Sequence, residues 1–352
     1  KADQLTKITD PRGKITTYVY DGFGQLWRQV SPDSGTTTYS YNAYAQLIQM
    51  ARNDGSLTTY GYDNLGRLTS VAAGGQTQGY GYDWCTNGKG RLCNTESPAS
   101  TQHYAYMPDG RLYIRREWIR GNAVETDYWT YYYYDAIGRL NAITYPNGTA
   151  VGYGYVYGKP ATMTVNINGV VSNVVTGTNY EPFGPAEWWG YGNGVSHSRG
   201  TDLDGRVSIK TAWNGSGNLQ NLSYSYDTSD RITKITNGAD GSLTQNFGYD
   251  ALSRLTSAVW ASGSQSQALT YDANGNRTSY RWQTPTSAPE PYTIDAASNR
   301  VLNTQFAYGY DARGNRSSQS WSGSTATYGY DGFNRQTSVT RNTASSFTNP
   351  NY

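Results

Sequence analysis

Tyr62-Asp63-Asn64-Leu65-Gly66-Arg67-Leu68 is the stretch that decides the fold, because the chain repeats it along most of its length. Close copies begin at Tyr20, Tyr134, Tyr249, Tyr271 and Tyr310, and weaker copies begin at Tyr41, Tyr82, Tyr106, Tyr226 and Tyr330. Clear neighbours lie about 20 to 24 residues apart. A fixed period in this range is the signature of a repeat architecture.

One repeat has the length of two short strands and two turns. Residues 57–62 alternate, so Tyr60 and Tyr62 are expected on one face of a strand. Asp63 suits the start of a turn, because its carboxylate accepts a backbone N–H two residues further on. Gly66 supplies the positive φ that such turns require. Each repeat is therefore predicted to be a β-hairpin with Tyr-Asp-x-x-Gly-Arg as its corner. The corner residues singled out are Tyr20, Asp21, Gly24, Tyr62, Asp63, Gly66, Arg67, Tyr134, Asp135, Gly138, Arg139, Tyr249, Asp250, Tyr271, Asp272, Gly275, Tyr310, Asp311 and Gly314.

The composition predicts a thin, aromatic-rich core. Leu, Ile, Val and Phe make up under a fifth of the 352 residues, whereas the chain contains 34 Tyr and 10 Trp. About a dozen hairpins make about 25 strands, and twisted open sheets rarely exceed about 10 strands without curling or splitting. We therefore expect an all-β fold, in which one long antiparallel sheet of hairpins spirals around a hollow space.

The repeat pattern varies along the chain. We expect a single β-shell region over residues 1–352, belonging to a larger polypeptide. Regular repeats are predicted over 1–144 and 211–340, an irregular segment over 145–210, and a frayed end over 341–352.

Cys85 and Cys93 bracket an enlarged corner turn, which places two strand ends within disulfide range. A local disulfide in an oxidising compartment is favoured, and two free thiols are the alternative. Zinc is disfavoured, since His103 and His197 are the two histidines and neither has ligand spacing.

The irregular segment holds the one candidate ligand-stacking patch, formed by Trp188, Trp189 and Tyr191. The alternative is an irregular turn that packs these rings inward. Residues 165–175 form a strand-like run, and the dipeptide Asn193-Gly194 predicts a tight turn.

No convergent set of titratable residues predicts catalysis. The pair Glu181 and Glu187 could be proposed as opposed carboxylates, but nothing raises it above chance. His197 stands among serines without a nucleophile motif, and the remaining ligands of a calcium loop are missing around Asp202 and Asp204. We therefore predict no enzyme, no cofactor and no metal. The even charge, with 28 basic and 26 acidic residues, argues against nucleic-acid binding, and no apolar run is long enough to span a membrane.

The Tyr-Asp-x-x-Gly-Arg-Leu corners resemble those of the RHS/YD-repeat family, over nearly the whole chain. The segments 180–194 and 85–93 resemble recurrent segments of bacterial members. The resemblance implies a hairpin sheet that spirals into a cocoon. In bacterial members the cocoon encloses a C-terminal toxin delivered by a secretion system or toxin complex, and in the animal teneurins it serves cell-surface adhesion. The family's self-cleavage segment has no match here, so that activity is assigned to no residue.

Three functions follow from these observations. The first is a non-catalytic shell of a secreted or surface protein, which encloses or presents a C-terminal toxin or effector of the same polypeptide. The second is an adhesion module that binds glycans or a cell-surface receptor through exposed Tyr and Trp ladders. The third is a subunit of a tyrosine-rich extracellular fibre, assembled through unpaired terminal strands.

Overall fold

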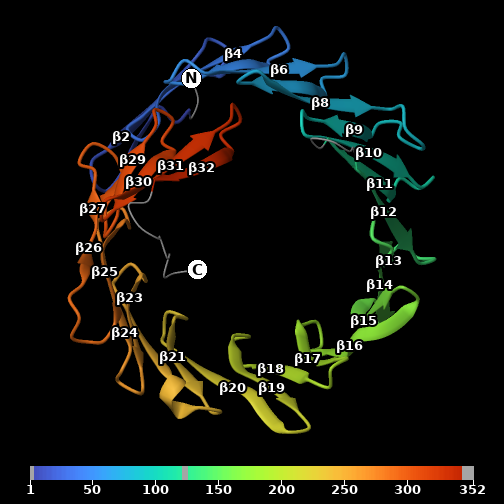
Figure 1. The fold of residues 1–352 in the computed structure, drawn as a ribbon, viewed down its shortest axis with the longest axis vertical. Coiled ribbons are helices and arrows are strands. Elements are labelled where there is room, and N and C mark those ends of the chain that lie inside the picture. The colour runs from blue at the N-terminus through green and yellow to red at the C-terminus, as the bar shows by residue number, and fades with distance from the viewer. Residues whose placement is uncertain (1–3, 121–125, 343–352) are drawn as a thin grey trace.

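The computed structural model describes residues 4–120 and 126–342, and shows a curved wall of β-strands around an open centre (Figure 1). Within these residues a 26-stranded sheet, β1 to β26, is followed by a six-stranded sheet, β27 to β32. Consecutive strands pair antiparallel, as in β6 with β7 and β7 with β8. The predicted all-β spiral of hairpins around a hollow is confirmed.

The strands are short, and η1 (Gly241–Leu243) is a single turn of 3-10 helix. Their bounds are β1 Lys7–Thr9, β2 Ile15–Tyr20, β3 Leu26–Ser31, β4 Gly35–Tyr41, β5 Leu47–Ala51, β6 Leu57–Tyr62, β7 Leu68–Ala73, β8 Gln76–Tyr82, β9 Leu92–Glu96, β10 Ser100–Tyr106, β11 Leu112–Ile119, β12 Thr126–Tyr134, β13 Leu140–Thr144, β14 Ala150–Val156, β15 Lys159–Ile167, β16 Val170–Tyr180, β17 Ala186–Tyr191, β18 Ser196–Thr201, β19 Val207–Asn214, β20 Gly217–Tyr226, β21 Ile232–Asn237, β22 Gln245–Tyr249, β23 Leu255–Trp260, β24 Ser266–Tyr271, β25 Arg277–Gln283, β26 Glu290–Pro291, β27 Thr293–Ile294, β28 Val301–Asn303, β29 Ala307–Tyr310, β30 Arg316–Trp321, β31 Ser324–Tyr330 and β32 Gln336–Asn342.

The hairpins continue through the segment 145–210, which the sequence marks as irregular. The run 165–175 is not one strand, because β15 and β16 meet at a tight turn through Asn168 and Gly169. Asn168 has a φ of 53° and Gly169 a φ of 87°, values that suit an Asn-Gly turn. The predicted turn at Asn193-Gly194 is also present, with the Gly194 N–H donating to the Tyr191 carbonyl at 3.1 Å.

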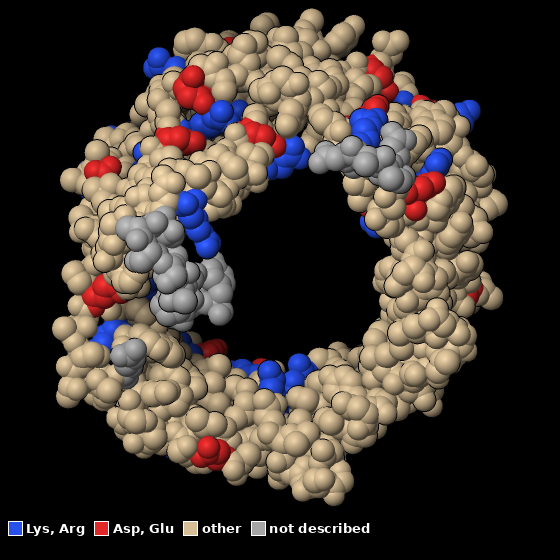
Figure 2. Space-filling view, viewed as in Figure 1, with Lys and Arg blue, Asp and Glu red and all other residues tan. Residues whose placement is uncertain are grey.

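The wall is thin and has almost no closed core. Its solvent-accessible surface is 21078 Å², against about 14,000 Å² for a compact monomer of this mass. Among the described residues, the buried apolar side chains are Ala73, Cys93, Ala161 and Ala258. Charged side chains are scattered over the wall around the open centre in Figure 2. No helix in the described part of the chain is long and apolar enough to cross a bilayer.

The wall overlaps its own beginning, so that the last strands of the chain lie near the first ones (Figure 1). The corner turns at 272–276, 295–300, 311–315 and 331–335 meet the opposite-edge turns at 10–14, 31–35, 52–56 and 73–76, and we call this contact the seam. Most of the direct contacts are polar. The Arg12 guanidinium donates to the carbonyls of Ser298 (2.7 Å) and Asp295 (2.9 Å). The Asn299 N–H donates to the Asp33 carboxylate at 2.8 Å.

An ion pair continues the seam, with Arg313 Nε 2.6 Å from Asp54 Oδ2. Although partial burial of Asp54 acts to raise its pKa, hydrogen bonds from Ser56 and Arg313 lower that pKa to about 2. The backbones also touch, because a Cβ built on Gly332 would lie 2.4 Å from the carbonyl carbon of Ala73. The seam therefore requires glycine at this corner position for steric reasons.

Gly332→Val is expected to push the two edges apart and open the seam. Small-angle X-ray scattering should show a larger maximum dimension for this variant than for the wild type. Gly22→Val is the matched control, since Gly22 holds the same place in the Tyr20-Asp21-Gly22-Phe23 corner and a Cβ there meets nothing within 4 Å. Superimposable scattering curves for the two variants would show that the seam does not determine the overall dimensions of the wall.

Candidate functional site

The corner motif forms a compact set of hydrogen bonds, and Asp63 is its centre. The Asp63 N–H donates to the Arg67 carbonyl (3.0 Å), and the Asp63 carbonyl accepts from Gly66 N–H (2.9 Å). Its Oδ1 accepts from the N–H groups of Leu65 and Arg67, each at 2.9 Å. Its Oδ2 accepts from Arg67 Nε at 2.7 Å. Gly66 has a φ of 80°, which explains the glycine in the motif.

Each corner tyrosine ties its repeat to the one before it. The Tyr62 hydroxyl donates to the Leu47 carbonyl, and the Tyr82 hydroxyl donates to the Leu68 carbonyl, both at 2.9 Å. Among the described residues thirteen such bonds recur, from the hydroxyls of Tyr20, Tyr41, Tyr62, Tyr82, Tyr106, Tyr134, Tyr155, Tyr180, Tyr226, Tyr249, Tyr271, Tyr310 and Tyr330. Each bond contributes about 1 kcal/mol net.

The corner arginine reaches forward to the next repeat. The Arg67 guanidinium carbon lies 4.3 Å from the centroid of the Tyr82 ring. Equivalent contacts join Arg139 to Tyr155 (4.3 Å) and Arg254 to Tyr271 (4.8 Å). At exposed sites such a cation–π contact contributes about 0.5–1 kcal/mol. The Tyr, Asp, Gly and Arg of each motif thus link one hairpin to the next, and we call this set of contacts the lock.

Hydrogen bonds lower the pKa of the Asp63 and Asp83 carboxyls. The backbone N–H of Arg67, followed by its side chain, lowers the pKa of Asp63. The hydrogen bond from Arg67, followed by the Gly90 N–H, lowers the pKa of Asp83 to about 2. These carboxylates are therefore ionised at neutral pH and already engaged in the lock, which leaves them poorly suited to act as general acids.

The enlarged corner is closed by a disulfide between Cys85 and Cys93, whose Cα atoms lie 5.3 Å apart. Cys93 is fully buried, and its Sγ accepts from the Cys85 N–H at 3.0 Å. A Cβ built on Gly88 would lie 2.2 Å from the Cys85 Sγ and 2.6 Å from the Cys93 Sγ. This turn therefore has no room for a side chain at position 88.

The predicted stacking patch is divided between the two faces of β17. Trp189 and Tyr191 share one face, where Trp189 Nε1 donates to the Tyr191 hydroxyl at 2.8 Å. The Trp189 ring also stacks on His197, with centroids 4.5 Å apart. Trp188 points to the other face, because successive residues of a strand alternate. The three rings therefore do not form one platform.

The remaining candidate residues take structural positions. Glu181 replaces the aspartate of a corner, since its N–H donates to the Pro185 carbonyl at 3.1 Å. Asp202 and Asp204 pair with Arg206 at 2.8 and 2.9 Å. Within residues 4–120 and 126–342, no cluster of His, Cys, Asp and Glu could hold a metal ion.

Sequence reasoning missed an aromatic surface that crosses β10, β11 and β12. Its register places His103, Arg116 and Trp129 opposite one another on one face. The Arg116 guanidinium lies 4.9 Å from the Trp129 ring and bonds the Asp127 carboxylate at 2.9 Å. Trp129 stacks on Tyr131, with centroids 6.2 Å apart. Sequence reasoning could not bring these residues together, since the register of their strands is not readable from a single chain.

Comparison with known proteins identifies the family. Residues 195–348 match the model of the teneurin YD-shell, and residues 1–36 and 46–78 match the model of the RHS repeat. The chain belongs to the RHS/YD-repeat family. The sequence has no significant match among curated proteins.

Solved structures share the fold of this RHS/YD-repeat chain. The crystal structure of TcdB2–TccC3 without its hypervariable C-terminal region is similar with a TM-score of 0.79 and 16% identity, over 97% of this chain and 22% of that one. A mutant of the Photorhabdus luminescens Tc holotoxin pore gives 0.77 and 17%, over 93% of this chain and 20% of that one. The chain therefore spans about a fifth of the length of these structures.

Tyr62→Phe removes one hydroxyl of the lock while keeping the ring, and should lower the free energy of unfolding by about 1 kcal/mol. Thermal unfolding followed by circular dichroism measures the change. Tyr157→Phe serves as control, because Tyr157 is fully exposed. Equal melting temperatures for both variants would contradict a stabilising role of the hydroxyl.

Proposed function

We propose that this chain is a non-catalytic section of wall in a secreted bacterial RHS protein, and that the wall encloses or presents a toxin or effector of the same polypeptide. The observation that carries the proposal is the thin, strongly curved sheet, which surrounds open space and shares its fold with the TcdB2–TccC3 structures. One of those structures is the Photorhabdus luminescens Tc holotoxin pore, with a mutation in its TccC3 component. An enclosed cargo and a secreted location are proposed for this chain by likeness to that toxin.

The chemistry of the wall supports a passive container. Many of its ionisable side chains are used in pairs, such as Arg67 with Asp63 and Arg313 with Asp54. Its tyrosines donate to carbonyls of neighbouring repeats. We also propose that residues 1–352 form a single β-shell region, with regular repeats over 1–144 and 211–340.

Protease protection of the natural polypeptide tests the container role. The segment that carries the effector should resist a broad-specificity protease in the wild type and in Gly22→Val. It should become cleavable in Gly332→Val, because that variant opens the seam. Equal cleavage in all three proteins would refute enclosure.

A second candidate function is binding of neutral glycans by the aromatic surface on β10 to β12. Trp129 is 37% exposed and Tyr133 is 41% exposed, so ring faces are available to stack on sugars. Arg116 is already neutralised by Asp127, which favours an uncharged ligand.

A glycan array separates this candidate from a pure wall. If the surface binds glycans, Trp129→Ala should abolish a saturable signal, whereas the double variant Trp188→Ala/Trp189→Ala should retain it. Loss only in the β17 variant would move the site to Trp188, Trp189 and Tyr191. Absence of any saturable signal in the wild type would exclude this function for the glycans on the array.

A further inference from the structure

Two corners near the end of the wall depart from the motif in the same way. The usual ending Gly66-Arg67-Leu68 becomes Gly275-Asn276-Arg277 in one and Gly314-Asn315-Arg316 in the other. The register is unchanged, since Leu68 pairs with Tyr62 just as Arg277 pairs with Tyr271 and Arg316 pairs with Tyr310. An arginine therefore occupies the place of a leucine on the sheet.

In these two corners an asparagine, not an arginine, bonds the corner carboxylate. Asn276 Nδ2 donates to Asp272 Oδ2 at 2.9 Å, and so replaces the bond that Arg67 Nε makes to Asp63. Within the described part of the chain, the guanidinium groups of Arg277 and Arg316 form no hydrogen bond or ion pair with protein groups. Each lies between two tyrosines instead. Arg277 is 4.9 and 4.8 Å from the rings of Tyr280 and Tyr292, and Arg316 is 5.6 and 4.9 Å from those of Tyr308 and Tyr328.

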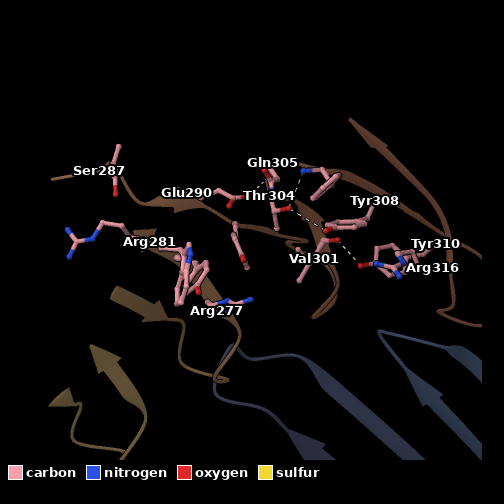
Figure 3. A pocket seen from close by; sticks show the side chains of 15 residues that line it. Arg277, Arg281, Ser287, Glu290, Val301, Thr304, Gln305, Tyr308, Tyr310 and Arg316 are labelled. Carbon is pink, nitrogen blue, oxygen red and sulfur yellow. Dashed lines mark hydrogen bonds between the residues drawn. The ribbon is translucent and has the colours of Figure 1, made fainter. Parts of the chain in front are cut away.

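Both arginines line one open cavity of about 780 Å³, at the break between the two sheets. They enter it from β25 and β30, as Figure 3 shows. Trp282 and Phe306 add apolar walls. The lining residues include three arginines, Arg277, Arg281 and Arg316, and one carboxylate, that of Glu290, which already accepts from the Gln305 N–H. The cavity is therefore cationic, aromatic and open.

We propose that this cavity binds an acidic polypeptide segment, in which an apolar or aromatic residue stands between carboxylates. Unpaired guanidinium groups favour carboxylates, with which they form two parallel hydrogen bonds. Trp, Tyr and Arg are the side chains that dominate the energy of protein interfaces. The cavity is larger than a single carboxylate needs, and its walls offer apolar surface beside the charges. The site does not depend on whether the wall encloses a cargo.

Isothermal titration calorimetry of the 352-residue chain tests the proposal, with the synthetic peptide acetyl-Glu-Leu-Glu-Phe-amide as probe and the same peptide with Gln for Glu as reference. The Glu peptide should bind saturably, and the Gln peptide at least about tenfold more weakly, because charged hydrogen bonds are lost. Arg277→Leu/Arg316→Leu should abolish binding and keep the fold, since leucine occupies this place in other repeats.

The matched control is Lys210→Leu, which removes a cation 5.8 Å from the Tyr224 ring and outside the cavity. This variant should bind the Glu peptide as the wild type does. If the leucine double variant does not fold, Arg277→Gln/Arg316→Gln replaces it. No binding of the Glu peptide, or equal binding by the arginine variants, would overturn the proposal. Binding of polygalacturonate without binding of the peptide would reassign the cavity to acidic polysaccharides and equally overturn it.

Discussion

The hydrogen bond from each corner tyrosine to a carbonyl of the preceding repeat is the interaction on which this wall depends. Backbone pairing joins neighbouring strands, and the tyrosine hydroxyl adds a contact at the corner, beyond the last paired residues. The Tyr62 hydroxyl fixes the position of its corner relative to Leu47, one repeat earlier. Because Arg67 in turn covers the Tyr82 ring, each repeat is held from both sides. The motif therefore encodes the contact between repeats as well as the hairpin itself.

This arrangement explains how a chain with so few aliphatic residues folds. Tyrosine offers a large ring and a polar tip, so it packs along the sheet while its hydroxyl remains hydrogen-bonded. Almost nothing in the described residues is fully buried except small side chains such as Ala73 and Ala258. The wall is consequently stabilised along its length, strand by strand, as in repeat proteins generally. It does not need a filled interior.

The sequence predicts the parts of the fold that repeat locally. The hairpin, the turn role of Asp63 and the positive φ of Gly66 follow from residue chemistry within seven positions. The bond from Tyr62 to Leu47 was not predicted, since a motif read by itself does not show which group of the previous repeat it meets. The seam was not predicted either, because the meeting of Asp54 with Arg313 depends on curvature summed over many strands.

Two local features were missed although a signal was present. Asn168-Gly169 is the same dipeptide that predicted the turn at 193–194, yet the valines around it masked it within a run. Glu181 forms a corner in place of aspartate, and Pro182 and Pro185 obscured the similarity of this segment to the Tyr-Asp corner motif. The division of Trp188 from Trp189 follows from strand alternation, so it could be read once β17 was recognised. The presence of Arg277 and Arg316 where other repeats have leucine was also visible in the sequence. Only the structure shows that both arginines line one cavity.

The seam joins residues 259 to 289 positions apart, from Asp54 with Arg313 to Asp10 with Asn299. A chain that meets its own edge after a similar number of residues each time has a girth set by the curvature of each hairpin. Extra hairpins then add height and leave the girth unchanged. In such a design, a gene that gains or loses repeats one at a time would alter the capacity of the vessel in small steps, with no change to any single joint.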